Sequence, residues 1–290
     1  MKTIPCLCCN RRRANYFFTK KYRTETYAIY RCGYCKSAFV WPRPGTRNIE
    51  ALYAADNNDP VGSQRIRSKV PRYYPEARHD ADMVLKQCGV LSTGKRLLDV
   101  GAGFGDFSKA ALKKGFKITA REPNAMSRDV FSRLNGFEPD PVMFDAQYAA
   151  KLGPAFNVVT VSHVLEHILD PDRFVENIRN VLDKGGITTI LVPHFGSVLS
   201  ILQGKRDMFI SPPEHLNFFS KKGLCHLFYR HGFSLKRLET TSKINRRRLE
   251  QTIRIPVVST LSWVWLYMGL AFLNPLNMGM VINAYFKKET

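Results

Sequence analysis

Residues 95–114 read Lys-Arg-Leu-Leu-Asp-Val-Gly-Ala-Gly-Phe-Gly-Asp-Phe-Ser-Lys-Ala-Ala-Leu-Lys-Lys, and this stretch decides the fold. Residues 95–100 form a short apolar run typical of a strand, residues 101–105 form a glycine loop, and residues 106–114 have a helical pattern. Strand, glycine loop and helix in this order begin a doubly wound α/β sheet. The glycines let the backbone approach a ligand and expose the helix N-terminus to it.

The residues after this unit indicate what the loop binds. A second strand is predicted over residues 116–120, and Glu122 lies 23 residues beyond Asp99. An acid at the end of the second strand is placed to hold a ribose diol. The glycines follow the order Asp-x-Gly-x-Gly-x-Gly instead of Gly-x-Gly-x-x-Gly. That order argues against a dinucleotide whose pyrophosphate lies at the helix end.

Together, residues 98–105 and Glu122 resemble the class I S-adenosylmethionine-dependent methyltransferases. The resemblance continues through residues 156–167, 182–193 and 213–220, and it covers residues 6–240 and the final strand. In one branch of that family, which includes sugar C-methyltransferases, a four-cysteine zinc module precedes the core.

The resemblance implies an α/β fold with a Rossmann-like, seven-stranded methyltransferase sheet. Its domain would occupy residues 91–290, after a zinc ribbon in residues 1–47 and a helical connector in residues 48–90. The last two strands, residues 233–240 and 279–286, would pair antiparallel at the sheet edge. An apolar helical insertion would lie between them, at residues 241–277.

The resemblance also implies roles for cofactor-binding residues. The methionine part of S-adenosylmethionine would lie against the first strand and its loop, the ribose against the acid of the second strand, and the adenine beside an acid after the third. A polar residue ending the fourth strand would face the crevice. These residues are Asp99, Gly101, Gly103, Glu122, Asp145 and Ser162.

Methyl transfer depends mainly on positioning, because the sulfonium donor is already activated, but the acceptor can still need a base. His167, His163 and His215 are the candidates, and His167 is our first choice. Each of them could instead have a purely structural role. His163 to His167 also spell His-x-x-Glu-His, a zinc-protease signature. We reject that interpretation, because His163 is predicted to end a buried strand whereas a protease needs the motif within a helix.

Four of the seven cysteines form two C-x2-C pairs separated by 22 residues: Cys6, Cys9, Cys32 and Cys35. Two such pairs can hold one zinc ion, and four sulfur ligands leave no position for water, so the site would be structural. Residues 16–30 are rich in Tyr, Phe and Thr, which predicts a β-hairpin between the pairs. Cys8 is an alternative ligand. Disulfides compete with metal, and the lack of an apolar leader before the cysteines favours metal.

Charge and hydropathy suggest the partners. The 290 residues carry a formal net charge of +20, concentrated in residues 1–47 and 201–290, and 44% are hydrophobic, as in a globular protein. This excess favours an anionic partner. Residues 246–276 combine arginines with a stretch that is apolar on every helical face, which either meets an anionic membrane surface or packs on protein as a lid or homodimer face.

We therefore expect an S-adenosylmethionine-dependent methyltransferase acting on a small or carrier-linked acceptor, such as a sugar nucleotide or a lipid-linked glycan. It would be cytoplasmic, or peripheral on the inner face of a membrane. One alternative is an RNA methyltransferase that docks through the zinc ribbon. The fourth strand, however, ends in Ser-His-Val-Leu and not in a base-binding loop, so nucleic acid is less favoured. A second alternative is a non-catalytic, cofactor-binding scaffold protein.

Overall fold

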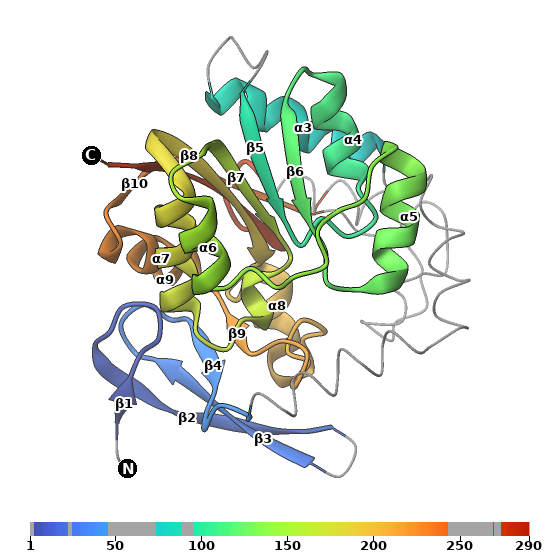
Figure 1. Ribbon diagram of the computed structural model, residues 1–290. Coiled ribbons are helices and arrows are strands. Elements are labelled where there is room, and N and C mark those ends of the chain that lie inside the picture. Colours follow the sequence, from blue (N-terminus) through green and yellow to red (C-terminus); the bar gives the residue numbers. More distant parts are fainter. Residues whose placement is uncertain are drawn as a thin grey trace, which may run out of the picture.

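The computed structural model describes residues 3–22, 25–45, 74–88, 95–242, 269 and 274–289. Two sheets organise these residues, a six-stranded sheet and a five-stranded sheet near the N-terminus (Figure 1). The larger sheet has the order β10-β11-β8-β7-β5-β6. Its strands are β5 (Arg96–Val100), β6 (Lys117–Arg121), β7 (Phe156–Ser162), β8 (Leu182–Pro193), β10 (Phe233–Thr241) and β11 (Val281–Lys288).

The strand directions follow the hydrophobic pattern. β6, β5, β7 and β8 are mutually parallel. The central residues of β5, β7 and β8 are buried and mostly apolar, as expected for strands covered on both faces, whereas those of β6, at the sheet edge, are half-buried. β11 pairs antiparallel with β8, and β10 pairs antiparallel with β11 at the edge. The predicted antiparallel pair at the end of the chain is therefore confirmed.

Helices cover both faces of this sheet. Figure 1 shows α3 (Tyr74–Cys88), α4 (Asp106–Lys113) and α5 (Ala125–Asn135) on one face. The other face carries α6 (Ala146–Leu152), α7 (Pro171–Val181) and α9 (Lys221–Arg230). Local sequence fixes where several of them begin: for example, Asp170 accepts a hydrogen bond from the amide of Arg173, and Pro171 occupies the first turn of α7. Between β8 and β9 lie α8 (Val198–Gln203) and the short 3-10 turn η3 (Gly204–Arg206).

The prediction of seven strands differs from the structure, which has six in this sheet within the described residues. Where a third strand was expected, the chain makes only a single parallel bridge between Arg121 and Asp140. The amide of Glu122 donates to the carbonyl of Asp140 at 3.0 Å, so this edge is still tied to β6. Val142 and Met143 follow with exposed side chains, and an outermost strand would gain little by extending along them.

Three other expectations concern segments that lie largely outside the described residues. Of the helical connector at 48–90, only α3 is described, and the other residues of the connector lie outside the described residues. Most of the predicted insertion at 241–277, and with it the segment 246–276, lies outside them as well. No described helix is long and apolar enough to cross a membrane.

The five-stranded sheet joins the N-terminal module to the rest of the chain. Its order is β1-β2-β3-β4-β9, and every neighbouring pair is antiparallel. The strands are β1 (Ile4–Pro5), β2 (Arg12–Tyr22), β3 (Glu25–Cys32), β4 (Ala38–Val40) and β9 (Asn217–Phe218). The hairpin of β2 and β3 confirms the one predicted between the cysteine pairs. β9 comes from the second half of the chain and contacts η2 (Leu165–His167), the short 3-10 turn after β7. The N-terminal module therefore packs at the carboxyl ends of the parallel strands (Figure 1).

His194, directly after β8, links that strand to the segment before β11. It is buried, and its Nδ1 donates to the carbonyl of Gly279 at 2.8 Å. Burial lowers the pKa of His194 to about 4. The folded chain therefore keeps this imidazole neutral at a pH where the unfolded chain, with an ordinary pKa of about 6.5, binds a proton.

We expect His194 to make the protein less stable as the pH falls below about 6.5. From about pH 7.5 to about pH 5, this group alone should remove about 2 kcal/mol of unfolding free energy. Urea titrations of wild type and His194→Asn, which keeps a donor toward Gly279, measure the effect. Between about pH 7.5 and about pH 5, wild type should lose about 2 kcal/mol more unfolding free energy than His194→Asn. Comparing the two proteins cancels the contributions of groups that they share. A difference that does not change with pH contradicts the assignment.

Candidate functional site

Several of the predicted cofactor-binding residues lie at the carboxyl ends of the parallel strands. β5 lies between β6 and β7, and Val100 of β5 pairs with Arg121 of β6 and Val161 of β7. Gly101, Glu122 and Ser162 come directly after these three residues. Strand pairing therefore brings the predicted cofactor residues from three strands to the same level, at the carboxyl ends where open α/β sheets bind ligands.

The glycines in the loop after β5 have different roles. Gly101 has φ +71°, and a Cβ built on it would lie 2.3 Å from Cγ2 of Val164, so it is needed for packing. Gly103 has φ +55°, and no described atom lies within 4 Å of a Cβ built there. The loop is thus closed against the protein at Gly101 and open at Gly103, where a ligand could approach the backbone.

Glu122 braces this loop from the end of β6. One carboxylate oxygen accepts from the amide of Gly103, and the other accepts from the amide of Asn124, both at 2.8 Å. The side chain is buried, and burial raises its pKa. Each oxygen has a second lone pair, so the carboxylate could also accept from ribose hydroxyls.

Asp99, in β5, is held from inside the sheet. Its two oxygens accept from the hydroxyls of Ser108, at 2.6 Å, and Thr160, at 3.0 Å. Burial raises the pKa of Asp99 to about 6. These contacts fix the start of the glycine loop relative to α4 and β7, so Asp99 shapes the loop whatever the loop binds.

Asp145 lies farther along the same edge and is exposed. It begins α6, where its Oδ1 accepts from the amide of Tyr148 at 2.8 Å. The guanidinium of the buried Arg121 lies 3.1 Å from the centre of the Tyr148 ring, and it donates to the carbonyls of Val142 and Met143. This packing fixes the segment between β6 and α6 and leaves the other oxygen of Asp145 available to a ligand.

The three predicted histidines meet around a carboxylate. His163 follows β7 with φ +55°, its side chain is 49% exposed, and its Nδ1 lies 3.3 Å from Oε1 of Glu166. The rings of His167 and His215 lie 4.8 Å apart, centre to centre. Glu166 and His167 belong to the 3-10 turn η2 (Leu165–His167), and His215 belongs to the loop before β9.

Burial shifts the pKa values of the acid and of the imidazole in this cluster in opposite directions, because it disfavours the charged form of each. Burial alone would raise the pKa of Glu166, but the neighbouring histidines, with His163 foremost, lower it below its usual value. Burial lowers the pKa of His167. Near neutral pH the cluster therefore contains a carboxylate beside neutral imidazole, which is a state suited to accepting a proton or a cation.

Two residues that the sequence did not indicate position this cluster. The guanidinium of Arg43 donates to the carbonyls of Ile168, Leu169 and Leu216 at 2.7 to 3.0 Å, and to Oδ1 of Asn217 at 3.0 Å. The amide of Asn217 donates to the carbonyls of Leu165 and Ile168. Together they fasten η2 to the loop of His215. Asn217 lies within the segment Pro-Glu-His-Leu-Asn-Phe-Phe-Ser, whose resemblance to the family could have indicated a role. No sequence pattern indicated Arg43.

Basic residues of the N-terminal sheet lie near a small cavity that His215 borders. Lys20 donates to the carbonyl of Asp207, and Arg31 lies 5.6 Å from the ring centre of Phe195. Both Asp207 and Phe195 line this cavity. The module therefore brings positive charge close to the cavity that His215 borders.

The four predicted cysteines converge from the turn after β1 and from the end of β3 with the turn that follows it. Their sulfur atoms all lie within 4.8 Å of one another; Cys6 and Cys35 are 3.5 Å apart, and Cys9 and Cys32 are 3.7 Å apart. A tetrahedral ion with zinc–sulfur bonds of about 2.3 Å needs sulfurs about 3.8 Å apart. The donor set thus fits one tetrahedral metal ion. Cys8 is buried next to it but is not one of the four.

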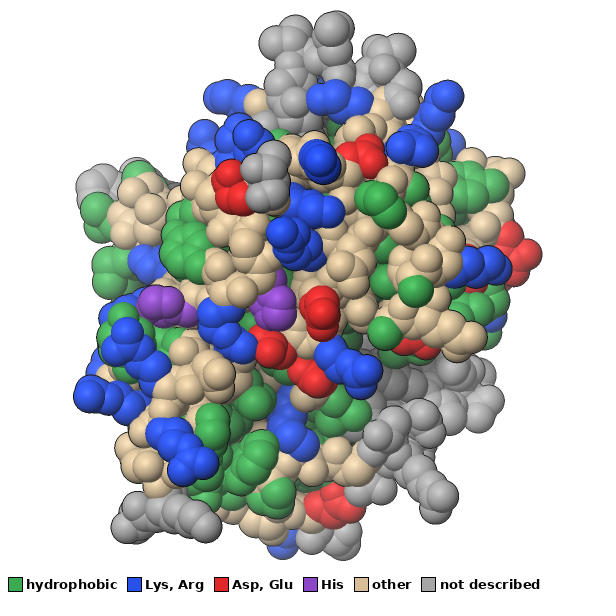
Figure 2. All heavy atoms as spheres, turned by 60° about the vertical axis from the view of Figure 1, so that its left-hand side comes forward, with side chains coloured by type: hydrophobic (Ala, Val, Ile, Leu, Met, Phe, Trp, Pro, Cys, Tyr) green, Lys and Arg blue, Asp and Glu red, His purple; other side chains and the backbone are tan. Residues whose placement is uncertain are grey.

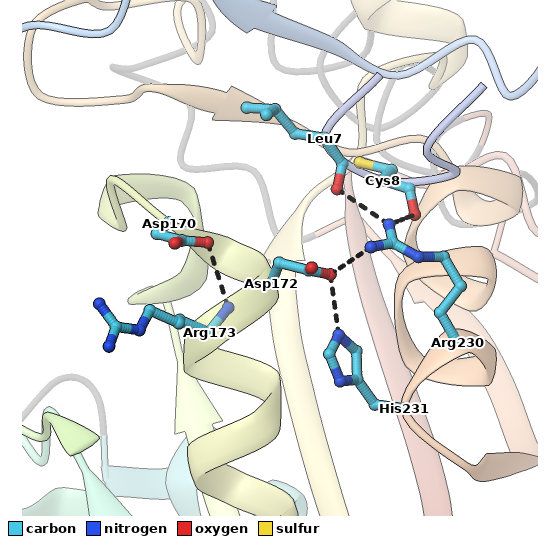
Figure 3. Close-up of polar contacts among 7 residues, drawn as sticks. All are labelled: Leu7, Cys8, Asp170, Asp172, Arg173, Arg230 and His231. Carbon is cyan, nitrogen blue, oxygen red and sulfur yellow. Dashed lines mark hydrogen bonds and ion pairs between the residues drawn. The ribbon is translucent and has the colours of Figure 1, made fainter. Parts of the chain in front are cut away.

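Arg230 ties this cysteine cluster to the helices of the core (Figure 3). Its guanidinium donates to the carbonyl of Cys8 at 2.9 Å and to Oδ1 of Asp172 at 2.6 Å. His231 reaches the same oxygen of Asp172 at 2.8 Å. The first cysteine pair is therefore linked through α9 to the start of α7, the helix that follows the histidine cluster.

Comparisons with known proteins agree with this geometry. The family model described as "Methyltransferase domain" matches residues 67–238. The ubiquinone biosynthesis O-methyltransferase of Caulobacter sp. strain K31 is 32% identical over 102 residues, which are 33% of this chain and 40% of the relative. That of Aeromonas salmonicida strain A449 is 27% identical over 145 residues, which are 46% and 60%. The chain thus spans about two fifths to three fifths of the length of these relatives.

Solved structures share the fold. Phosphoethanolamine N-methyltransferase 2 of Haemonchus contortus, in complex with S-adenosyl-L-methionine, has a TM-score of 0.50 at 18% identity, over 73% of this chain and 53% of that one. The (4+2)-cyclase SpnF has a TM-score of 0.51 at 20% identity, over 73% and 81%. At these identities the likeness concerns the fold. Since one of the two is named a cyclase, the fold by itself leaves the reaction to be decided by the site.

Proposed function

Because this chain belongs to the methyltransferase domain family, within the class I S-adenosylmethionine-dependent enzymes, we propose that it methylates an anionic acceptor. The acceptor is a small or carrier-linked molecule such as a sugar nucleotide or a lipid-linked glycan. The observation that carries the proposal is the position of His163. It follows β7 directly, at the edge where the glycine loop follows the neighbouring β5, and half of its side chain is exposed.

The cofactor residues have the roles that their positions favour. Gly103 holds the methionine part, on a loop that Asp99 and Gly101 shape, and Glu122 accepts from the ribose hydroxyls. Asp145 faces the adenine, and Ser162 lies at the crevice. The open backbone at Gly103 and the spare lone pairs of Glu122 support these assignments. Bound S-adenosylmethionine supplies an activated methyl group.

His163 acts as the base in preference to His167, our first choice from sequence. Nδ1 of His167 lies 2.7 Å from the carbonyl of Glu214, whereas His163 is the exposed member of the cluster and is oriented by Glu166. Nε2 of His163 takes the acceptor's proton as the acceptor's electron pair bonds to the methyl carbon. When bound, S-adenosylmethionine would give up its methyl group and keep the electrons of the broken carbon–sulfur bond on sulfur, as S-adenosylhomocysteine.

The charge around the cavity favours an acceptor that carries phosphate. Lys20 and Arg31 approach it from the N-terminal sheet, and Lys205 lies on the same side, 5.7 Å from the ring centre of Phe18. Figure 2, which brings the left-hand side of Figure 1 forward, shows Lys and Arg side chains spread widely over that face of the molecule. A diphosphate next to the methylated group would reduce the mutual repulsion of these cations.

An exposed apolar surface supports the carrier-linked form of the acceptor. Ile201 and Leu202 of α8 have exposed fractions of 68% and 77%. Such side chains next to basic ones suit an interfacial contact with an anionic membrane. The same surface could instead join two copies of the chain.

We further propose that the four cysteines bind a structural zinc ion. Their sulfur atoms have the spacing of a closed tetrahedral site, so the metal would act on stability and leave no position for a substrate. Its effect on the active site would be indirect, through β4, β9 and Arg43.

Two measurements test the proposed function. Calorimetry should show one S-adenosylmethionine bound per chain, with S-adenosylhomocysteine competing for the same site. Labelled methyl groups should then pass to nucleotide-linked sugars and not to the free sugars, and His163→Gln should lower the rate by about 100-fold or more with cofactor affinity unchanged. Absence of cofactor binding overturns the proposed methyltransferase activity, and methyl transfer to RNA alone overturns the proposed acceptor.

A further inference from the structure

Three side chains of the histidine cluster are arranged as a metal site. Glu166, His167 and His215 each present one ligand atom, and these atoms all lie within 4.8 Å of one another. Two belong to η2 and one to the loop before β9, and these segments are fastened together by Arg43 and Asn217. The site is thus held by the fold and does not depend on one flexible segment.

Hydrogen bonds to the backbone fix which nitrogen each imidazole offers. Nδ1 of His167 lies 2.7 Å from the carbonyl of Glu214, and Nδ1 of His215 lies 2.7 Å from the carbonyl of Phe209. A carbonyl can only accept, so each Nδ1 carries the proton, and each Nε2 keeps a lone pair in the neutral ring. A metal-binding histidine characteristically donates its other nitrogen to such a carbonyl or carboxylate.

Glu166 supplies the charge. Only 1% of the residue is exposed, and its Oε1 accepts from His163, while its Oε2 has no hydrogen-bond partner among the described residues. A buried carboxylate oxygen without a partner is unfavourable unless a cation compensates it. An ion between Glu166 and the two Nε2 atoms would provide that compensation.

The geometry points to a divalent transition-metal ion bound by Glu166, His167 and His215. Two imidazoles and one carboxylate suit ions such as Fe²⁺, Co²⁺ or Zn²⁺, and three protein ligands leave positions open for another molecule. The site differs from a zinc-protease motif, because its third ligand is His215 and η2 is a single 3-10 turn. It also differs from the cysteine cluster, whose four sulfurs close the coordination sphere.

An open metal site here would deepen the proposed function. An oxygen of the acceptor could bind the ion, which lowers the pKa of a coordinated hydroxyl and fixes its orientation. His163, on the other oxygen of Glu166, would then remove the proton. This use of the metal rests on the proposed methyl transfer, whereas the binding of the ion does not.

Binding of Co²⁺ tests the site directly. Untagged protein whose cysteine cluster is filled with zinc is titrated with Co²⁺ by calorimetry, and bound metals are counted after gel filtration. We expect one Co²⁺ per chain in addition to the zinc, with visible absorption of nitrogen and oxygen ligation and not of sulfur. Glu166→Gln and His215→Gln should each weaken it by at least about 10- to 100-fold. His226→Gln, on α9 outside the cluster, is the matched control and should bind as wild type.

The same samples separate this proposal from the proposed function. S-adenosylmethionine affinity and the urea midpoint are measured for each variant, and both should stay close to wild type if the variants fold. Absence of the additional Co²⁺, or binding that Glu166→Gln and His215→Gln leave unchanged, overturns the metal site even where the cofactor binds. Co²⁺ binding without cofactor binding would support the metal site and overturn the methyltransferase.

Discussion

Removal of the proposed zinc ion from the cysteine cluster should unfold the N-terminal module. The sheet of residues 3–45 is small and buries few apolar side chains apart from the cysteines and the residues packed on β9. In small zinc domains the metal contributes a binding free energy of roughly 10–16 kcal/mol, most of which is folding free energy. We expect chelation to lower the unfolding midpoint strongly and to expose the cysteine thiols to alkylation.

The loss should reach the histidine cluster. β4 pairs with β9, and Arg43 holds the carbonyls of Ile168 and Leu216. Without the module, η2 and the loop of His215 would no longer be fastened to each other. Methyl transfer should therefore fall sharply, while S-adenosylmethionine, which we propose binds at the ends of β5 and β6, keeps most of its affinity.

Cys32→Ser tests this without a chelator. It should lose about one zinc per chain and show the same low midpoint. Cys225→Ser, on α9 outside the cluster, is the matched control and should keep both the zinc and the stability. A chelated protein that unfolds at the wild-type midpoint would show that the module is held by packing alone. Loss of stability on adding a reductant, in protein with no bound metal, would favour disulfides.

The central part of the fold was predictable because its signals are local. In residues 95–114 the apolar strand, the glycines and the helix each follow from neighbouring residues, and β5 and α4 lie where the pattern places them. The cysteine pairs and the intervening hairpin are local in the same sense. The prediction of a third strand failed because an edge strand depends on the strand it can pair with. Among the described residues, this edge makes a single bridge, between Asp140 and Arg121.

The arrangement of the histidines was less accessible. His163 and His167 could be identified from their position after a strand, but the approach of His215 depends on a loop 48 residues beyond His167. Arg43 had no signal, since its partners are backbone carbonyls, which any sequence provides. The zinc-protease interpretation of His-x-x-Glu-His fails for a local reason: His163 directly follows β7 and η2 is a single 3-10 turn, so the motif lacks a regular helix.

Replacement of Glu122 should have the largest effect on cofactor binding. A carboxylate that accepts from two ribose hydroxyls contributes about 1.5–3 kcal/mol per hydrogen bond. Glu122→Gln, which keeps an oxygen for the amide of Gly103 but loses the charge, should therefore weaken S-adenosylmethionine roughly 10- to 1000-fold. Isothermal titration calorimetry measures this directly. Glu138→Gln, at an exposed position between α5 and the bridge at Asp140, is the matched control and should bind normally.

A double-mutant cycle distinguishes ribose binding from bracing of the loop. Glu122 contacts the amides of Gly103 and Asn124, so its replacement could also act by loosening the loop. A cofactor analogue with a 2′-deoxyribose should bind wild type more weakly but should lose little further affinity with Glu122→Gln, because the lost contact is the same one. If the two losses simply add, Glu122 does not hold that hydroxyl and acts on the cofactor only through the loop.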